Sequence, residues 1–275
     1  FNGVAFALSA LLVVTTAIPQ SANAEGKRKE STWEKVSFGI RAYLKTPRLR
    51  GLLACSLAVA SAGAMVIVNT VVIVRGGFVL AEKDVAIAMA AYGSGSMLVA
   101  LALPKILNNL SDRPVMLVAA GILAGGLIAG SFVGSFFWLL PIWFLLGCAA
   151  SAINTPTGRL LRRSSAPEDK PAYFAAQFSL SHACWLITYP LVGWLGAVYG
   201  IDIVFCVMAG IIAVAFVAAL LLWPKDDTIE LTHRHTDLPE NHPHIQGAEP
   251  IGNGYRHSHP FVIDKQHKVW PREEK

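Results

Sequence analysis

Seven of the protein's 8 histidines follow residue 224, and six of these stand in pairs separated by one residue. Imidazole nitrogens suit nickel, cobalt, copper or zinc. The segment contains no cysteine, is polar and proline-rich, and has no helical periodicity, which predicts disorder. We therefore interpret residues 225–275 as a His-rich tail that is disordered or loosely extended. We expect no cofactor, with a divalent metal at the tail as the alternative, because no geometry is preset at the paired ligands His233, His235, His242, His244, His257 and His259.

Within the same tail, residues 259–264 (HPFVID) place an apolar patch between polar flanks. Such a pattern is typical of a segment that docks on another surface. We therefore expect this stretch to make a contact, although the sequence does not indicate with what.

Opposite charges stand side by side at Asp112 and Arg113, directly before a long apolar run. Asp112 can cap the helix that follows and interact with the positive end of its dipole. Arg113 can pair with a carboxylate or with a lipid phosphate.

A few polar or aromatic side chains lie inside apolar spans, where each is costly unless it faces protein or water. His182 is the only one that titrates readily near neutral pH. It is a candidate for proton coupling, and the alternative is an interhelical hydrogen bond. The candidates for a substrate or proton pathway are Asn69, Tyr92, Asn154, Gln177, His182 and Trp185.

Composition indicates an integral membrane protein. Charged residues make up 15% of the chain, against about 25% in soluble domains, and apolar residues make up 54%. The net charge of +5 does not indicate nucleic acid, because the basic residues flank apolar spans. There is no P-loop, no Ser-His-Asp pattern and no pair of carboxylates within a span, so we expect no enzymatic activity.

The spans are long and repeated. Residues 114–158 contain no charged side chain over about twice the ~20 residues that cross a bilayer, and a break at Gly134 divides them into a hairpin. The six spans expected within the bundle are residues 52–74, 85–104, 114–134, 136–158, 171–199 and 203–224. We interpret residues 51–224 as a six-helix transmembrane bundle in contact with lipid.

Loop charges predict the topology. The loops that follow the second and fourth spans are basic, as is the segment before residue 51. The loops on the opposite side carry only two basic residues, Arg75 and Lys83. The bias predicts a multi-pass protein of the plasma membrane, meaning a bacterial inner membrane, with a cytoplasmic tail. The cytoplasmic anchors after the fourth span are Arg159, Arg162 and Arg163.

Residues 20–50 form a basic cytoplasmic linker. Ser31 and Glu34 match a capping box, and apolar residues then recur at helical spacing, so we expect an amphipathic helix at the membrane surface that ends before Pro47. The alternative is a plain linker. Residues 1–19 are apolar and resemble either a transmembrane helix or a signal peptide, and the context favours the helix.

Two packing features are expected inside the bundle. Glycines spaced by four along residues 121–134 favour close helix contacts. Four tryptophans are expected as interface anchors: Trp138, Trp143, Trp194 and Trp223.

Three stretches resemble the major facilitator superfamily of transporters, in its exporter branch. Residues 2–11 (NGVAFALSAL) are similar to the family's sixth helix, and residues 154–159 (NTPTGR) to the cytoplasmic end of its tenth. Residues 110–114 (LSDRP) occupy the place of the second copy of the loop motif G-x-L-x-D-R-x-G-R, although Val115 and Met116 replace its last Gly and Arg. The resemblance covers residues 1–224.

The resemblance implies an all-α fold, a polytopic transmembrane helix bundle. It would be the six-helix C-terminal half of a major facilitator fold plus one preceding helix. It implies that Asp112 and Arg113 form a gating loop in alternating access; the alternative is a simple cap and anchor. The family's substrate site lies between its two halves, so the missing N-terminal half of the same protein is an expected partner.

Three functions are compatible with these observations. The first is a proton-coupled secondary exporter of small molecules, such as drugs or siderophore-like compounds. The second is a divalent metal exporter of nickel, cobalt or zinc, whose tail collects metal in the cytosol. The third is a membrane scaffold without transport activity.

Overall fold

The computed structural model describes residues 2–16, 31–228, 230–235, 239, 242–264 and 267–271. They fall into two compact units, Phe1–Glu34 and Lys35–Lys275. In the first unit, α1 (Asn2–Thr15) is a mostly apolar helix of 14 residues. Residues 17–30 lie outside the described part, so the transmembrane helix predicted for residues 1–19 and the signal-peptide alternative both stay predictions.

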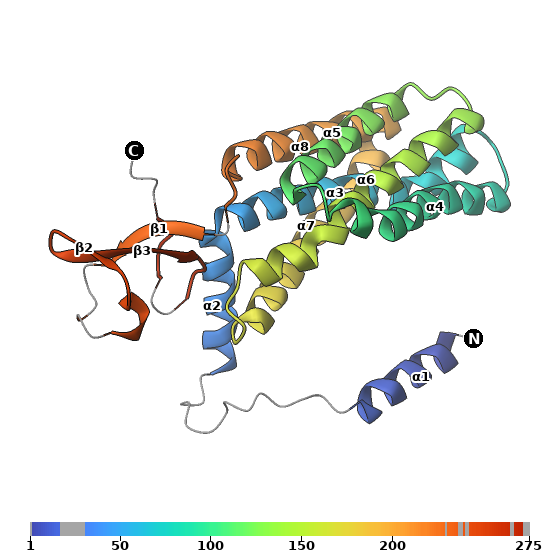
Figure 1. Cartoon of the computed structure of the whole chain (residues 1–275). Coiled ribbons are helices and arrows are strands. Elements are labelled where there is room, and N and C mark those ends of the chain that lie inside the picture. Colours follow the sequence, from blue (N-terminus) through green and yellow to red (C-terminus); the bar gives the residue numbers. More distant parts are fainter. Residues whose placement is uncertain are drawn as a thin grey trace. The chain divides into compact units, whose positions relative to one another are not determined.

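The second unit is built around six long helices, which occupy the six predicted spans (Figure 1). The helix α3 lies at the centre and contacts the other five, α4 packs mainly on α6, and α5 packs on both α6 and α8. The helices are α3 (Pro47–Val71), continued by the π-helix η1 (Val72–Gly77), α4 (Glu82–Ile106), α5 (Asp112–Ser131), α6 (Phe136–Arg163), α7 (Lys170–Tyr199) and α8 (Ile201–Leu222).

These helices have the length and composition of membrane spans. Five in the described part of the chain are long and apolar enough to cross a bilayer: α3 with η1, α4, α5, α6 and α8. The helix α7 is also long, at 30 residues, but its mean hydropathy is lower than that of these five. Prolines 141, 156 and 190 lie inside α6 and α7 and do not end them. The fold is therefore an all-α polytopic bundle.

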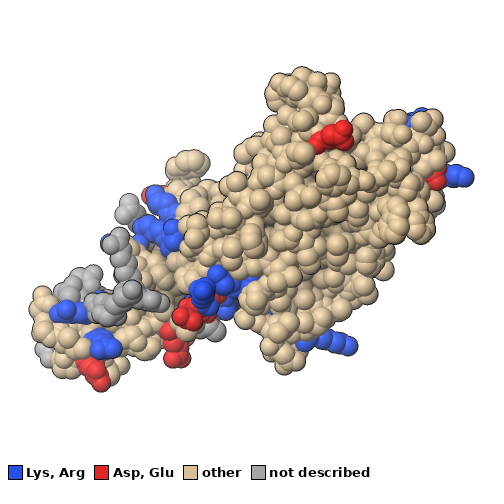
Figure 2. All heavy atoms as spheres, turned by 90° about the horizontal axis from the view of Figure 1, so that it is seen from above, with Lys and Arg blue, Asp and Glu red and all other residues tan. Residues whose placement is uncertain are grey.

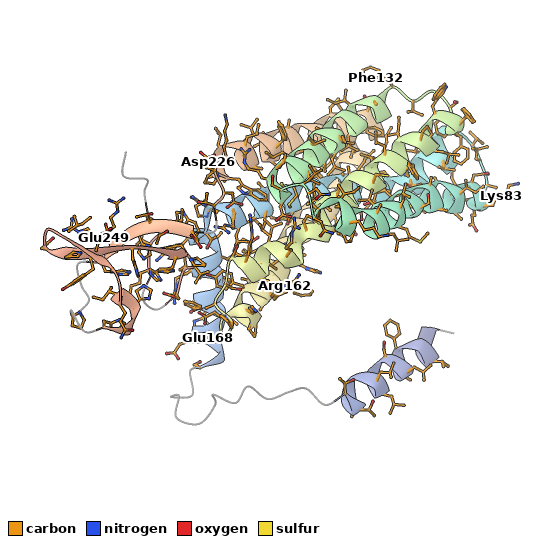
Figure 3. The ribbon with its side chains drawn as sticks, viewed as in Figure 1. Lys83, Phe132, Arg162, Glu168, Asp226 and Glu249 are labelled. Atoms are coloured by element: carbon orange, nitrogen blue, oxygen red, sulfur yellow. The ribbon has the colours of Figure 1, made fainter. Side chains whose placement is uncertain are left out.

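Charge is distributed as a membrane requires. Figure 2 shows a broad surface over the helices that carries very few charged side chains. In Figure 3, Lys83 and Phe132 lie at one end of the bundle, and Arg162, Glu168 and Asp226 lie at the other. The second end, which we call the base, is the end from which the tail continues.

Two glycines bring α4 and α6 into backbone contact. A Cβ on Gly147 would lie 2.0 Å from the carbonyl oxygen of Tyr92, and a Cβ on Gly95 would lie 2.1 Å from that of Phe144. The glycine repeat of α5 behaves differently, since Gly126 faces a leucine side chain and Gly125 has open space. Close backbone approach thus occurs at α4 and α6, not along the predicted repeat.

Two of the four tryptophans expected at the interface are core residues instead. Trp143 is fully buried, and its Nε1 donates to Thr70 Oγ1 at 2.8 Å. Trp223 is also fully buried. Each indole N–H has a partner inside the protein, which removes the need for the lipid interface. Trp138 and Trp194 are exposed, as an interface position requires.

The linker helix α2 (Thr32–Lys45) begins at the predicted capping box and ends before Pro47. The Ser31 N–H donates to the Glu34 carboxylate at 2.9 Å, and Ser31 Oγ accepts from the Trp33 N–H at 3.3 Å. From Lys35 onward the helix packs on the bundle, where a Cβ on Gly39 would lie 2.4 Å from the Ala172 carbonyl oxygen of α7. Part of its apolar face therefore covers protein.

The tail is folded in its described residues, so the predicted disorder is wrong there. Three antiparallel strands, β1 (Glu230–His235), β2 (Glu249–Ile251) and β3 (Gly254–Pro260), form a sheet in the order β1-β3-β2. A two-residue turn at Gly252 and Asn253 joins β2 to β3, and Gly252 supplies the φ of +60° that this turn needs. A short 3₁₀ turn, η2 (Pro243–Ile245), precedes β2.

Candidate functional site

An ion pair joins three helices at the base. Asp112 is the first residue of α5, its side chain is 2% exposed, and Arg159 of α6 binds its carboxylate with Nε at 3.1 Å from Oδ1. Arg159 also donates from Nη1 to the Leu107 carbonyl, directly after α4, at 2.8 Å. The cap predicted for Asp112 is thus replaced by a cross-helix pair, and Ser111 occupies the N-cap position.

Arg113 joins α5 to the end of α8. Its Nε donates to the Trp223 carbonyl at 2.9 Å, and its Nη2 donates to the Leu220 carbonyl at 3.3 Å. A cation at this position complements the negative end of the α8 dipole. Its partners in the described residues are therefore backbone carbonyls rather than a carboxylate, and the lipid phosphate stays a prediction.

Asp227 is a second charged centre, and the sequence analysis missed it. Arg48 Nε lies 3.1 Å from its Oδ1, Arg163 binds its Oδ2, and the Trp223 indole donates to Oδ2 at 3.0 Å. One carboxylate therefore ties the start of α3, the end of α6 and the end of α8. Of the three predicted anchors, Arg159 and Arg163 form these pairs, and Arg162 is exposed (Figure 3).

Two of the six pathway candidates are enclosed within the bundle. Asn69 is 2% exposed, and its Nδ2 lies 3.4 Å from Met65 Sδ. Gln177 is 9% exposed; its Oε1 accepts from the Tyr43 hydroxyl of α2, and its Nε2 donates to Ser56 Oγ of α3 at 3.2 Å. The Gln177 amide thus links α7 to α2 and α3, whereas the Asn69 amide contacts a residue of its own helix, α3.

The other four candidates are more accessible. Asn154 and His182 are exposed, and Tyr92 and Trp185 are half-buried. The His182 Nδ1 lies 2.8 Å from the Phe178 carbonyl oxygen, one turn earlier in α7. If the neutral ring donates there, its Nε2 is the nitrogen that can take a proton. The six candidates therefore divide into two groups, and their role in a pathway stays a prediction.

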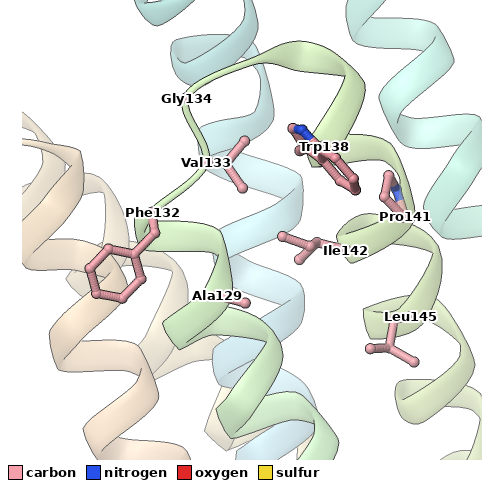
Figure 4. A pocket seen from close by; sticks show the side chains of 8 residues that line it. All are labelled: Ala129, Phe132, Val133, Gly134, Trp138, Pro141, Ile142 and Leu145. Atoms are coloured by element: carbon pink, nitrogen blue, oxygen red, sulfur yellow. The ribbon is translucent and has the colours of Figure 1, made fainter.

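An apolar pocket of about 420 Å³ lies at the turn between α5 and α6 (Figure 4). Val133 lines it from the turn, and Trp138, Pro141 and Ile142 line it from α6. The residues that line it carry no ionisable group. This pocket offers surface for an acyl chain but no chemistry for recognising an ion.

The strongest candidate site lies in the sheet. Side chains alternate between the two faces of a strand, so an H-x-H pair puts both rings on one face. His233 and His235 do this on β1, and His257 and His259 do it on β3, with His233 and His257 directly paired in register. His244 from η2 and His267 from the segment after β3 complete the cluster. His242 belongs to neither of its ligand groups; its Nδ1 accepts from the His244 N–H.

The cluster offers two overlapping sets of four ligands, within each of which the ligand atoms lie within 4.8 Å of one another. Three pairs of Nε2 atoms lie close together: His233 and His235 at 3.0 Å, and His233–His267 and His244–His267 at 3.1 Å each. Around a tetrahedral ion with metal–nitrogen distances of ~2.0–2.1 Å, neighbouring nitrogens lie ~3.3 Å apart. The strand set is His233, His244, His257 and His259, and the loop set is His233, His235, His244 and His267.

The environment favours the neutral imidazoles that bind metals. Burial, followed by the neighbouring histidines, lowers the pKa of His244 to about 4, and burial also lowers the pKa of His233 to about 4 and that of His257 below its usual value. The Nε2 atoms of His257 and His259 are buried without a hydrogen-bond partner among the described residues. Buried nitrogens of this kind fit metal ligands.

Outer groups and access also fit a metal site. Asp264 Oδ1 lies 3.1 Å from His267 Nδ1, an arrangement that orients Nε2 of the ring towards a metal. A pocket of about 790 Å³ opens beside the cluster, and its lining residues include His244, His257, His259 and Glu249. The all-nitrogen donor set suits zinc, nickel, cobalt or copper rather than magnesium or calcium.

The six-helix bundle with its charged base defines a multi-pass membrane protein. The Major Facilitator Superfamily model matches residues 52–261, which is about three quarters of the 275 residues. The chain therefore belongs to the major facilitator superfamily, whose members are transporters. The matched region begins within α3 and extends past α8 through β3. A search of curated proteins finds no match.

Proposed function

We propose that this chain forms part of a secondary active exporter of divalent transition-metal ions, with the folded tail as a metal-binding module. The observation that carries the proposal is the convergence of six imidazoles from β1, η2, β3 and the following segment. Neutral nitrogen ligands select zinc, nickel, cobalt or copper. In a transporter, such a module can bind the metal ion that is to be transported.

The distribution of charge supports a cytoplasmic base and tail in the plasma membrane. Arg48, Arg159, Arg162 and Arg163 lie at the base, at the start of α3 and the end of α6. Arg75 and Lys83 lie at the opposite end of the bundle. Cytoplasmic loops carry the excess of Lys and Arg. Metal collected by the tail then comes from the cytosol, which supports export.

Asn154 on α6 and His182 on α7 are exposed polar side chains within the spans, and they support a path along these two helices. Substrate sites of such transporters lie near the midplane between two halves, so a second set of helices has to face this side. We assign proton coupling to His182 because it is the only histidine within the six spans, and an imidazole ring can both accept and donate a proton. The first half of the same protein is the expected partner.

Metal tolerance tests the proposal in cells that express the intact protein. His233 and His244 belong to both ligand sets, so the double variant His233→Ala/His244→Ala removes two ligands from each. We expect this variant to lose most of the tolerance to nickel, cobalt or zinc that the wild type confers. His242→Ala is the matched control, because His242 lies outside both sets. Equal metal tolerance of the double variant and the wild type would refute the proposal.

A further inference from the structure

The segment after β3 joins the histidine cluster to the helices. We call residues 261–264 and 267–271 the docking segment. Phe261 and Ile263 are each 3% exposed and belong to the same hydrophobic core as the helices. The Ile263 carbonyl accepts from the Tyr173 hydroxyl, in the first turns of α7, at 2.9 Å. The apolar patch predicted to dock therefore packs on this chain's own bundle.

A second contact holds the other side of the segment. The Lys45 ammonium, at the last residue of α2, donates to the Lys268 carbonyl at 2.8 Å. The Trp270 ring lies beside the Arg48 guanidinium, 5.3 Å from its Cζ, within range of a cation–π contact. The docking segment thus touches α2, α3 and α7.

His267 lies between these contacts. Its backbone N–H donates to Asp264 Oδ1 at 2.6 Å, and the Asp264 N–H donates to the His267 carbonyl at 3.2 Å. Two hydrogen bonds thus link Asp264 to His267; Ile263 directly precedes Asp264, and Lys268 directly follows His267. A ligand that fixes the His267 ring therefore fixes the two neighbouring carbonyls that bind α7 and α2.

We propose that a metal ion in the loop set clamps the docking segment against the base of the bundle, so that metal occupancy controls how firmly α2 is held to α7. This inference rests on the proposed metal site and adds a regulatory consequence to it. The strand set lacks His267, and its nearest ligand, His259, precedes the contacts of the segment with α2 and α7 rather than lying between them.

The clamp acts at a place where α2 and α7 already interlock. Gly39 lies against the Ala172 backbone, and the Tyr43 hydroxyl donates to Gln177. The docking segment adds Lys45 and Tyr173 to this contact from the tail side. Since Lys45 ends α2, release of the segment removes a bond from the end of α2 that leads into the bundle.

Hydrogen–deuterium exchange of the intact protein, with and without Zn²⁺, tests the clamp. If the ends of α2 and α7 open only when the ion leaves, Zn²⁺ at a hundred times its Kd slows their exchange by up to about 100-fold. His235→Ala removes a ligand from the loop set alone, and His257→Ala removes one from the strand set alone. We expect the protection to disappear in His235→Ala and to persist in His257→Ala.

Calorimetric titration of Zn²⁺ into the same samples separates the two proposals. If the wild type binds no Zn²⁺, the proposed metal module fails and the clamp fails with it. If the wild type binds Zn²⁺ but α2 and α7 exchange at unchanged rates, only the clamp is overturned. Protection that survives in His235→Ala, or that disappears equally in His257→Ala, also overturns it.

Discussion

Replacing Gly147 by alanine tests whether the backbone contact between α4 and α6 holds the bundle together. The added Cβ would lie 2.0 Å from the Tyr92 carbonyl oxygen, whereas real Cβ contacts essentially never fall under 3.0 Å. The obstacle is backbone, which no side-chain rotation can move away. The helices have to separate locally by about 1 Å, the difference between these two distances.

The cost follows from this displacement. Overpacking of a well-packed interior destabilises by about 1–3 kcal/mol, and separation also weakens the reciprocal contact at Gly95. We therefore expect Gly147→Ala to lower the free energy of unfolding by about 1–3 kcal/mol, measured in mixed detergent micelles. Transport should fall as well, because α6 also carries Arg159 of the base.

Gly93→Ala is the matched control. Gly93 also lies in α4, and a Cβ there would meet nothing within 4 Å. Alanine is the better helix former, so this variant should be as stable as the wild type or slightly more stable. If Gly147→Ala unfolds at the same detergent composition as Gly93→Ala, the close backbone contact between α4 and α6 does not stabilise the bundle.

Three further perturbations have expected outcomes. Asp112→Asn leaves the Arg159 guanidinium without its charged partner at the base, and we expect the transport rate of the intact protein to fall; an unchanged rate would exclude a gating role. A double-mutant cycle of Trp143→Phe and Thr70→Val should give a coupling free energy of about 0.6 kcal/mol, the average for hydrogen bonds between transmembrane helices. A coupling free energy of zero would show that this hydrogen bond does not contribute to stability. Adding a chelator to metal-loaded protein should lower its Tm, because an ion that binds only the folded tail stabilises it by mass action; an unchanged Tm would show that the tail holds no such ion.

Hydropathy predicted the helices well, because a bilayer restricts what can cross it. All six predicted spans are helices, and the charged turns between them lie near the expected residues. The capping box at Ser31 could also be predicted from the sequence, since it depends on local backbone geometry. The side-chain pairs that join different helices could not be predicted from the sequence, because they depend on how each helix is rotated about its axis. Asp112 with Arg159 and Trp143 with Thr70 are examples of such pairs.

The sheet was missed although the sequence contains its signals. The spacing of His233 with His235 and of His257 with His259 equals the two-residue period of a strand. The turn at Gly252 and Asn253 is typical of a hairpin. Polar composition and prolines outweighed these signals and predicted disorder. His267 has no partner at this spacing, so only the folded segment places it in the cluster.

Flux of Zn²⁺ or Ni²⁺ through proteoliposomes that contain the intact protein tests the central claim most directly. An imposed proton gradient should drive either ion against its own gradient, and collapse of the proton gradient should stop it. The His233→Ala/His244→Ala variant should transport more slowly at low metal concentration. Absence of metal flux from active protein, with transport of organic compounds alone, would contradict the account.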